Sequence, residues 1–142
     1  AFKPIVKDGL GSYVTVHRKT GEMEEYPSVR DFMQAELSRD VSFIWSGNGE
    51  SPYQEREQWT DGCNLLTIRP GVALTYDRNP KTEKAFRDAG YDLLHAEDFL
   101  RSDIDPDSLK NTIITLPSSE LSRARGGPHC MSCPVLRDRL HS

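Results

Sequence analysis

Short runs of apolar residues recur along the chain. Turn signals separate them and mark where their spacing changes between that of a strand and that of a helix. Residues 13–17 alternate apolar and polar side chains as a half-buried strand does, and a turn-rich stretch separates them from a second candidate strand at 23–26. Ser28 then has the side chain of a helix N-cap. The apolar residues after it recur at helical spacing, at Val29, Phe32, Met33 and Leu37. The pattern predicts a hairpin followed by a helix of about ten residues.

The middle of the chain predicts another strand and a second hairpin. Residues 41–45 form a β-branched and aromatic run, which predicts a buried strand that enters the glycine-containing loop 46–49. Residues 64–68 and 72–76 flank an Arg-Pro-Gly turn and predict a hairpin.

The next helix carries both a start and a stop signal. Asn79 is the expected N-cap, because Pro80 follows it at the first helical position, and Gly90 is the expected stop. Three further elements are expected after it, namely a strand at 91–94, a short helix at 96–101 and a strand at 112–116. The order strand pair, helix, strand then occurs twice, so we expect an α/β fold of about two β-β-α-β units with mixed sheets, in a single domain over residues 1–142.

Composition and charge exclude several classes of partner. A chain of 142 residues with 36% hydrophobic and 28% charged residues fits one globular domain. Its formal net charge of −4 offers no basic surface, so neither nucleic acid nor an anionic membrane is an expected partner. No apolar run approaches the roughly 20 residues that cross a bilayer. We therefore expect a soluble, cytoplasmic protein.

Cys130 lies in the sequence PHCMSCP and admits three kinds of chemistry: nucleophile, metal ligand or redox partner. A zinc deaminase also needs an upstream H-x-E, for which only residues 95–97 fit, and a structural zinc site lacks a second ligand pair. A redox CxxC normally opens a helix, whereas Pro134 follows this one directly. A buried, inert cysteine on a terminal strand is the plain alternative.

The residues that precede the thiol favour the nucleophile. Arg123 and Arg125 place cationic charge near Cys130, which favours the reactive thiolate, and the glycines at 126–127 allow close approach of the backbone to a ligand. The planar fork of an arginine also suits a substrate that carries a carboxylate.

The stretch 119–134 (SELSRARGGPHCMSCP) resembles the C-terminal motif of arginine deiminases. A second block of the same family is similar to EREQWTDG at 55–62, followed by Asn64, Pro-Gly-Val at 70–72 and Tyr-Asp-Arg-Asn at 76–79. The loop 46–49 stands where that family has its glycine-rich loop. The resemblance runs from about residue 41 to the end, with extra residues around 94–110.

The resemblance implies both a fold and a reaction. The fold is a five-bladed α/β propeller (pentein), in which each blade is a β-β-α-β unit. The reaction converts L-arginine, or a related guanidine, to L-citrulline and ammonia through a covalent cysteine thiouronium intermediate, without a cofactor or a metal. Cys130 matches the nucleophile, and Arg125 matches an arginine near the substrate carboxylate. Ala124 stands where the family has a glycine whose carbonyl faces the substrate.

The same resemblance implies that other parts of the site are missing. The family's proton-transferring histidine and its guanidinium-binding carboxylates belong to earlier blades. We therefore expect this chain to be the C-terminal part of the enzyme, to be inactive alone, and to have the missing N-terminal part as a partner. Open sheet edges predict a homo-oligomer. The alternatives are a non-catalytic interaction module that retains the fold and a zinc or redox CxxC protein.

Several residues receive structural interpretations. His129 and Cys133 are expected on an extended terminal strand, pointing away from the nucleophile, with Cys133 buried. Cys63 is also expected in a strand. Residues 55–57 are interpreted as a helix-end salt-bridge cluster, and Trp59 as part of the core.

Overall fold

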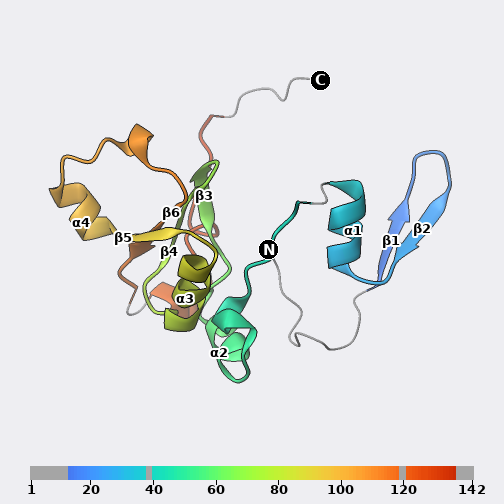
Figure 1. Ribbon diagram of the computed structural model, residues 1–142, viewed down its shortest axis with the longest axis horizontal. Coiled ribbons are helices and arrows are strands. Elements are labelled where there is room, and N and C mark those ends of the chain that lie inside the picture. The colour runs from blue at the N-terminus through green and yellow to red at the C-terminus, as the bar shows by residue number, and fades with distance from the viewer. Residues whose placement is uncertain (1–12, 38–39, 119–120, 137–142) are drawn as a thin grey trace. The chain divides into compact units, whose positions relative to one another are not determined.

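The computed structural model describes residues 13–37, 40–118 and 121–136, which divide between two compact units (Figure 1). The first unit comprises residues 1–44 and the second comprises residues 45–142. Each unit has a sheet of its own, with two strands in the first and four in the second. The α/β class expected from the sequence is confirmed, and the two units are described separately below.

The first unit consists of a hairpin and a helix, as the pattern of apolar residues predicts. Strands β1 (Val14–His17) and β2 (Met23–Tyr26) pair antiparallel, and helix α1 (Val29–Glu36) follows. Ser28 is the N-cap, and its hydroxyl oxygen accepts a hydrogen bond from the backbone N–H of Asp31 at 3.1 Å. The helix is shorter than expected because it ends at Glu36.

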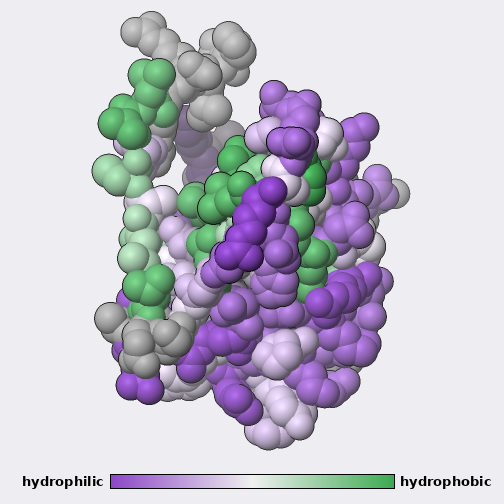
Figure 2. Space-filling view, turned by 90° about the vertical axis from the view of Figure 1, so that its left-hand side faces the viewer, coloured by the Kyte–Doolittle hydropathy of each residue, from purple (hydrophilic) through white to green (hydrophobic). Residues whose placement is uncertain are grey.

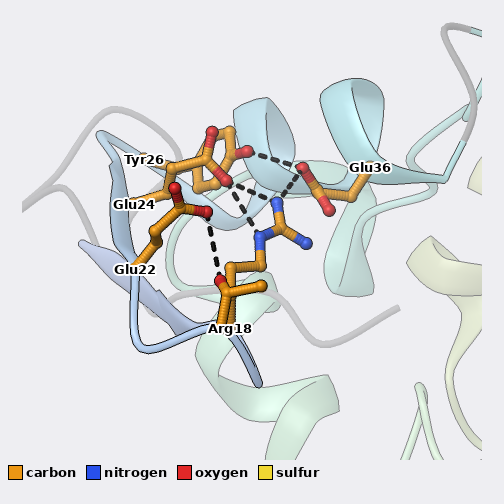
Figure 3. Close-up of polar contacts among 6 residues, drawn as sticks. Arg18, Glu22, Glu24, Tyr26 and Glu36 are labelled. Carbon is orange, nitrogen blue, oxygen red and sulfur yellow. Dashed lines mark hydrogen bonds and ion pairs between the residues drawn. The ribbon is translucent and has the colours of Figure 1, made fainter.

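A charged cluster joins this helix to the hairpin (Figure 3). The Arg18 guanidinium donates to Glu24 at 2.5 Å and to Glu36 at 2.6 Å. The Tyr26 hydroxyl donates to the same carboxylate of Glu36 at 2.7 Å. The hydrogen bond from Arg18, and to a smaller extent that from Tyr26, lowers the pKa of Glu36 to about 2. Three elements of the unit are thereby tied together through one carboxylate.

The prediction of a strand at residues 41–45 is wrong. Within the described part of the chain, this segment pairs with no strand, although its side chains have strong β propensity. Propensity alone does not make a strand, because each strand also needs a neighbouring edge to which its backbone can hydrogen-bond.

The second unit is built on a mixed sheet with the strand order β3-β4-β6-β5. Strands β3 (Leu66–Arg69) and β4 (Val72–Tyr76) form the predicted antiparallel hairpin. Strands β6 (Thr112–Leu116) and β5 (Asp92–His95) add to it in parallel. The hairpin and both later strands are confirmed, with ends that shift by one or two residues.

The core of this unit lies between the sheet and helix α3 (Pro80–Asp88). Tyr76 and Ile113 from the sheet are 1% and 2% exposed, and Phe86 of α3 is 6% exposed. The other helical segments are α2 (Tyr53–Trp59), α4 (Ala96–Arg101), and the 3-10 turns η1 (Ser46–Gly49), η2 (Pro106–Ser108) and η3 (Leu121–Ala124). Among the described residues, no helix has both the length and the apolar character needed to span a membrane.

Glu57 fixes α2 against the start of α3. Its carboxyl oxygens accept hydrogen bonds from the backbone N–H groups of Lys81 at 3.0 Å and Thr82 at 2.7 Å, and from the Thr82 hydroxyl at 2.7 Å. Glu57 is only 3% exposed. The salt-bridge interpretation of residues 55–57 is therefore wrong for Glu57, which caps a neighbouring helix and so fixes the position of the turn that follows α2.

Candidate active site

Cys130 lies in a turn that follows η3 and the glycine pair at 126–127. The backbone N–H of Met131 donates to the carbonyl of Gly127 at 3.2 Å, and that of Ser132 donates to the carbonyl of His129 at 3.1 Å. The Cys130 side chain is an exposed free thiol. The turn therefore presents the sulfur at the surface of the second unit.

The extended strand expected for this region is wrong. Residues 128–131 form turns, and His129 and Cys133 are both exposed. Two glycines followed by a proline allow the chain to bend here, and a proline cannot donate to a sheet ladder. Cys63 is not in a strand either. It lies in the turn after α2, half-buried, and burial raises the pKa of its thiol.

Asn64 directly contacts the candidate nucleophile. Its side-chain amide nitrogen lies 2.8 Å from the Cys130 sulfur and donates a hydrogen bond to it. The backbone N–H of Asn64 in turn donates to the carbonyl of Asp61 at 3.0 Å, which holds the asparagine in its turn. This amide donor fixes the direction of the Cys130 side chain, whose sulfur stays exposed. The sequence placed Asn64 in the right block and assigned it no role.

Three further contacts hold the glycine segment against the same turn. The Asp61 carboxylate accepts from the backbone N–H of Gly126 at 3.1 Å, and the Tyr76 hydroxyl donates to the Gly126 carbonyl at 3.3 Å. Gly127 is buried, and a Cβ at this position would lie 2.5 Å from the backbone oxygen of Asn64. Only glycine allows this close approach, so Gly127 lets the cysteine turn reach the asparagine.

Tyr76 connects the site to the core. Its ring is buried in the sheet, while its hydroxyl reaches both Gly126 and the sulfur of Met131, the latter at 3.1 Å. Burial, with smaller contributions from Asp61 and Cys130, raises the pKa of the Tyr76 hydroxyl. The hydroxyl therefore stays protonated at neutral pH and can act as a donor to the cysteine loop.

Arg125 lies next to the glycine pair and stacks on an aromatic ring. Its guanidinium carbon is 4.2 Å from the centre of the Trp59 ring, and its backbone is left-handed, with φ 62°. Trp59 is 66% exposed, so its interpretation as a core residue is wrong. Ala124 ends η3 and directly precedes Arg125. Arginine and tryptophan together form an exposed cationic platform beside the cysteine loop.

Two distant sequence blocks therefore meet at this site. Residues 59–64 contact residues 125–130 through the Asn64–Cys130 and Asp61–Gly126 hydrogen bonds and the arginine–tryptophan stack. His95 does not join them, because it lies on β5, at the sheet edge opposite to β3, and pairs with the hydroxyl of Thr115 at 3.0 Å. In the described part of the chain, no three His, Cys, Asp or Glu side chains are grouped so as to hold a metal ion.

Comparison with known proteins identifies the family. Fold and site together define a mixed α/β protein whose exposed cysteine is held by an asparagine amide and approached by a glycine-rich loop. The family model described as "Arginine deiminase" matches residues 12–137, and the chain belongs to the arginine deiminase family.

Individual relatives are similar over most of this chain. It is 38% identical over 125 residues to an arginine deiminase of Pediococcus pentosaceus, with 86% of this chain and 26% of the relative covered. It is 35% identical to one of Borrelia garinii subsp. bavariensis, with 91% and 27% covered, and 34% identical to one of Limosilactobacillus reuteri, with 96% and 30% covered. The chain thus spans between about a quarter and a third of the length of the relatives it matches.

Proposed function

We propose that this chain forms the C-terminal part of an arginine deiminase-like hydrolase that converts L-arginine to L-citrulline and ammonia. Family membership supports the reaction class. The observation that carries the proposal is the 2.8 Å hydrogen bond from the Asn64 amide to the Cys130 sulfur, because it joins the family's two sequence blocks around one exposed thiol.

In the proposed reaction, Cys130 acts as nucleophile. Its thiolate attacks the guanidinium carbon of arginine, a C–S bond forms, and the C–N bond to a terminal nitrogen breaks once that nitrogen has gained the proton with which it leaves as ammonia. Water then adds to the carbon of the thiouronium intermediate, the C–S bond breaks, and citrulline leaves with the thiolate restored. A proton donor and acceptor is required in both halves of the reaction.

The described residues fit particular roles in this scheme. Asn64 orients the Cys130 sulfur through its amide hydrogen bond. Arg125 has the planar donor fork that pairs with the substrate's carboxylate, and its exposure leaves this fork accessible. The backbone carbonyl of Ala124 is assigned to the substrate by the family resemblance alone.

The proton-transfer group and the carboxylates that hold the guanidinium are assigned to a further part of the protein. The relatives support this assignment, because this chain covers only 26–30% of their length. In this proposal, the chain contributes a β-β-α segment (β1, β2, α1) and a β-β-α-β unit (β3, β4, α3, β5) to the catalytic domain of a five-bladed α/β propeller of the pentein type. Related guanidines are alternative substrates.

Citrulline formation by the native protein from its source tests the proposal. The native protein should release citrulline and ammonia from L-arginine, and the Cys130→Ala variant should lose this activity by a factor of at least about 10³. Cys63→Ser is the matched control, because Cys63 lies half-buried outside the cysteine turn, and it should retain turnover. The 142-residue chain alone should form no detectable citrulline. Turnover that survives Cys130→Ala would contradict the proposal.

A further inference from the structure

Cys133, the second cysteine of the CxxC sequence, has no part in the proposed reaction. It is an exposed free thiol. It also lines a groove of about 600 Å³ that β3 forms with His129 and residues 132–134. The thiol is therefore accessible to small molecules and lies next to the nucleophile's loop.

The two cysteines lie near neighbouring residues of the chain. The Cys130 sulfur contacts Asn64, and Cys133 lines the groove with residues 66–68, which begin two positions further on. Cys130 is not itself a lining residue of this groove, so the two cysteines are related through residues 64–68.

The turn also shortens the path between the two cysteines. In an extended strand, residues three positions apart are separated by about 10 Å, beyond the roughly 7 Å that a disulfide tolerates between Cα atoms. Here the hydrogen bond from Ser132 to His129 closes a turn over residues 129–132, and such a turn keeps its end Cα atoms within about 7 Å. Cys130 lies inside this turn and Cys133 follows it directly, so the turn brings the two cysteines closer together than an extended strand would.

We propose that Cys130 and Cys133 form a reversible disulfide when a hydroperoxide oxidises the nucleophile, with Cys133 as the resolving thiol. The Cys130 thiolate attacks one oxygen of the peroxide, an S–O bond forms, the O–O bond breaks, and hydroxide or an alkoxide leaves. The Cys133 thiolate then attacks the Cys130 sulfenic acid, an S–S bond forms, the S–O bond breaks, and hydroxide leaves as water. The peroxide is reduced by two electrons and the thiol pair is oxidised by two.

The disulfide would switch off the proposed enzyme reversibly, a consequence that rests on the proposed function. The bridge occupies the sulfur that attacks arginine, and a dithiol reductant restores it. It also prevents a second peroxide from converting the sulfenic acid to the irreversible sulfinic acid. Cys63 is unsuited to the resolving role, because it is half-buried and burial raises the pKa of its thiol.

Peroxide treatment of the 142-residue chain tests the inference without any measurement of turnover. The chain is exposed to a few equivalents of hydrogen peroxide, free thiols are blocked with iodoacetamide, and peptides are mapped by mass. In the wild-type chain, a disulfide between Cys130 and Cys133 should form, with a mass loss of about 2 Da. Dithiothreitol should then restore the labelling of Cys130 by iodoacetamide. In the Cys133→Ser variant, the Cys130 sulfenic acid should proceed to sulfinic acid. Dithiothreitol should therefore restore at least several-fold less labelling of Cys130 than in the wild-type chain. Cys63→Ser should behave as wild type.

Two results would overturn the inference. One is equal recovery of Cys130 in the Cys133→Ser and wild-type chains, and the other is a wild-type link that includes Cys63. Failure here is distinguishable from failure of the proposed function. If the native protein shows activity that depends on Cys130 but no Cys130–Cys133 link forms, only the redox proposal is contradicted. If the link forms but the native protein shows no activity, only the proposed function is contradicted.

Discussion

The surroundings of its sulfur distinguish Cys130 from the other two cysteines at the scale of single residues. Cys130 is exposed and accepts a hydrogen bond from Asn64, whereas Cys63 is half-buried with a raised pKa. Cys133 is exposed as well, so exposure alone does not single out the nucleophile. The hydrogen bond from the asparagine amide is the feature on which the assignment of Cys130 rests.

Alkylation by iodoacetamide measures this difference. We expect Cys130 to be labelled before Cys63 and Cys133 in the folded chain. Asn64→Ala should slow the labelling of Cys130 at a fixed pH by up to about tenfold, as expected for the loss of a hydrogen bond to a charged group worth about 1.5 kcal/mol. Asn64→Asp should slow it further, since a carboxylate beside the sulfur repels the attacking thiolate.

The matched control for this experiment is Gln58→Ala, which removes another side-chain amide from an exposed position on α2. It should leave the rate of Cys130 labelling unchanged. A labelling rate that stays the same in Asn64→Ala, or a first label on Cys63, would show that the Asn64–Cys130 bond does not govern the reactivity of this thiol.

At the residue scale, the sequence indicates which residue types belong to the candidate site but not how they contact one another. The block around Cys130 and the block around Asn64 are legible because their residue types are unusual and ordered. That the Asn64 amide reaches the sulfur, or that Trp59 lies exposed under Arg125, depends on residues 66 positions apart in either case. No local pattern records such a contact.

At the scale of elements, Glu57 joins α2 to α3 and so supports the turn that carries Asn64. It accepts three hydrogen bonds in a buried setting. Glu57→Ala should lower the free energy of unfolding of the chain by about 3 kcal/mol, because it leaves buried donors of α3 without a partner. Urea unfolding followed by far-ultraviolet circular dichroism measures the change.

Glu97→Ala on α4 is the comparison, since Glu97 is exposed and pairs with Arg101 one turn away, at 3.4 Å. It should change the free energy of unfolding by less than about 0.5 kcal/mol. Equal stabilities of the two variants would mean that Glu57 does not support the start of α3.

The Arg18–Glu36 cluster makes the first unit sensitive to acid. The pKa of Glu36 is about 2 in the folded chain, below the ordinary 4.5 of a free glutamate. A group whose pKa is lowered by folding stabilises the folded state above its unfolded pKa, and this contribution is lost as the pH falls from about 4.5 to about 2. Carbon NMR of the side-chain carboxyl should show the Glu36 midpoint near pH 2.

Arg18→Gln should raise the Glu36 midpoint by at least one pH unit, since it removes the largest cause of the shift. Lys19→Gln provides the matched comparison, because it removes the neighbouring exposed cation of the same hairpin and should leave the Glu36 midpoint unchanged. A Glu36 midpoint near 4.5 in the wild-type chain would mean that the cluster does not form in solution.

Elements with both ends marked in the sequence were predicted well. Helix α3 starts at Pro80 and is followed by Gly90 with φ 86°, and the hairpin of β3 and β4 turns at Gly71 with φ 77°. The failures are residues 41–45 and the cysteine turn, where strand propensity or a strand pattern was assumed without a partner strand. Pairing is a property of the sheet, so a single segment cannot reveal it.

At the scale of the whole molecule, the second unit has an open sheet with β3 at one edge and β5 at the other. Figure 2 looks onto the side of Figure 1 that carries α4 and shows apolar surface bordered by hydrophilic surface. Leu100 of α4 is 80% exposed. Open edges and exposed apolar residues favour association, and the homo-oligomer expected from the sequence stays a prediction. The propeller is also a proposal, because its closure depends on residues outside this chain.

Trapping the covalent intermediate tests the central claim most directly. The native protein is mixed with arginine labelled at the guanidino carbon, quenched in acid within one turnover, digested and mapped by mass. The account predicts that the labelled carbon is attached to the peptide containing Cys130, as arginine less one ammonia, and that the adduct is absent in Cys130→Ala. Label on another residue, or steady citrulline formation with Cys130 replaced by alanine, would contradict the assignment of Cys130 as nucleophile.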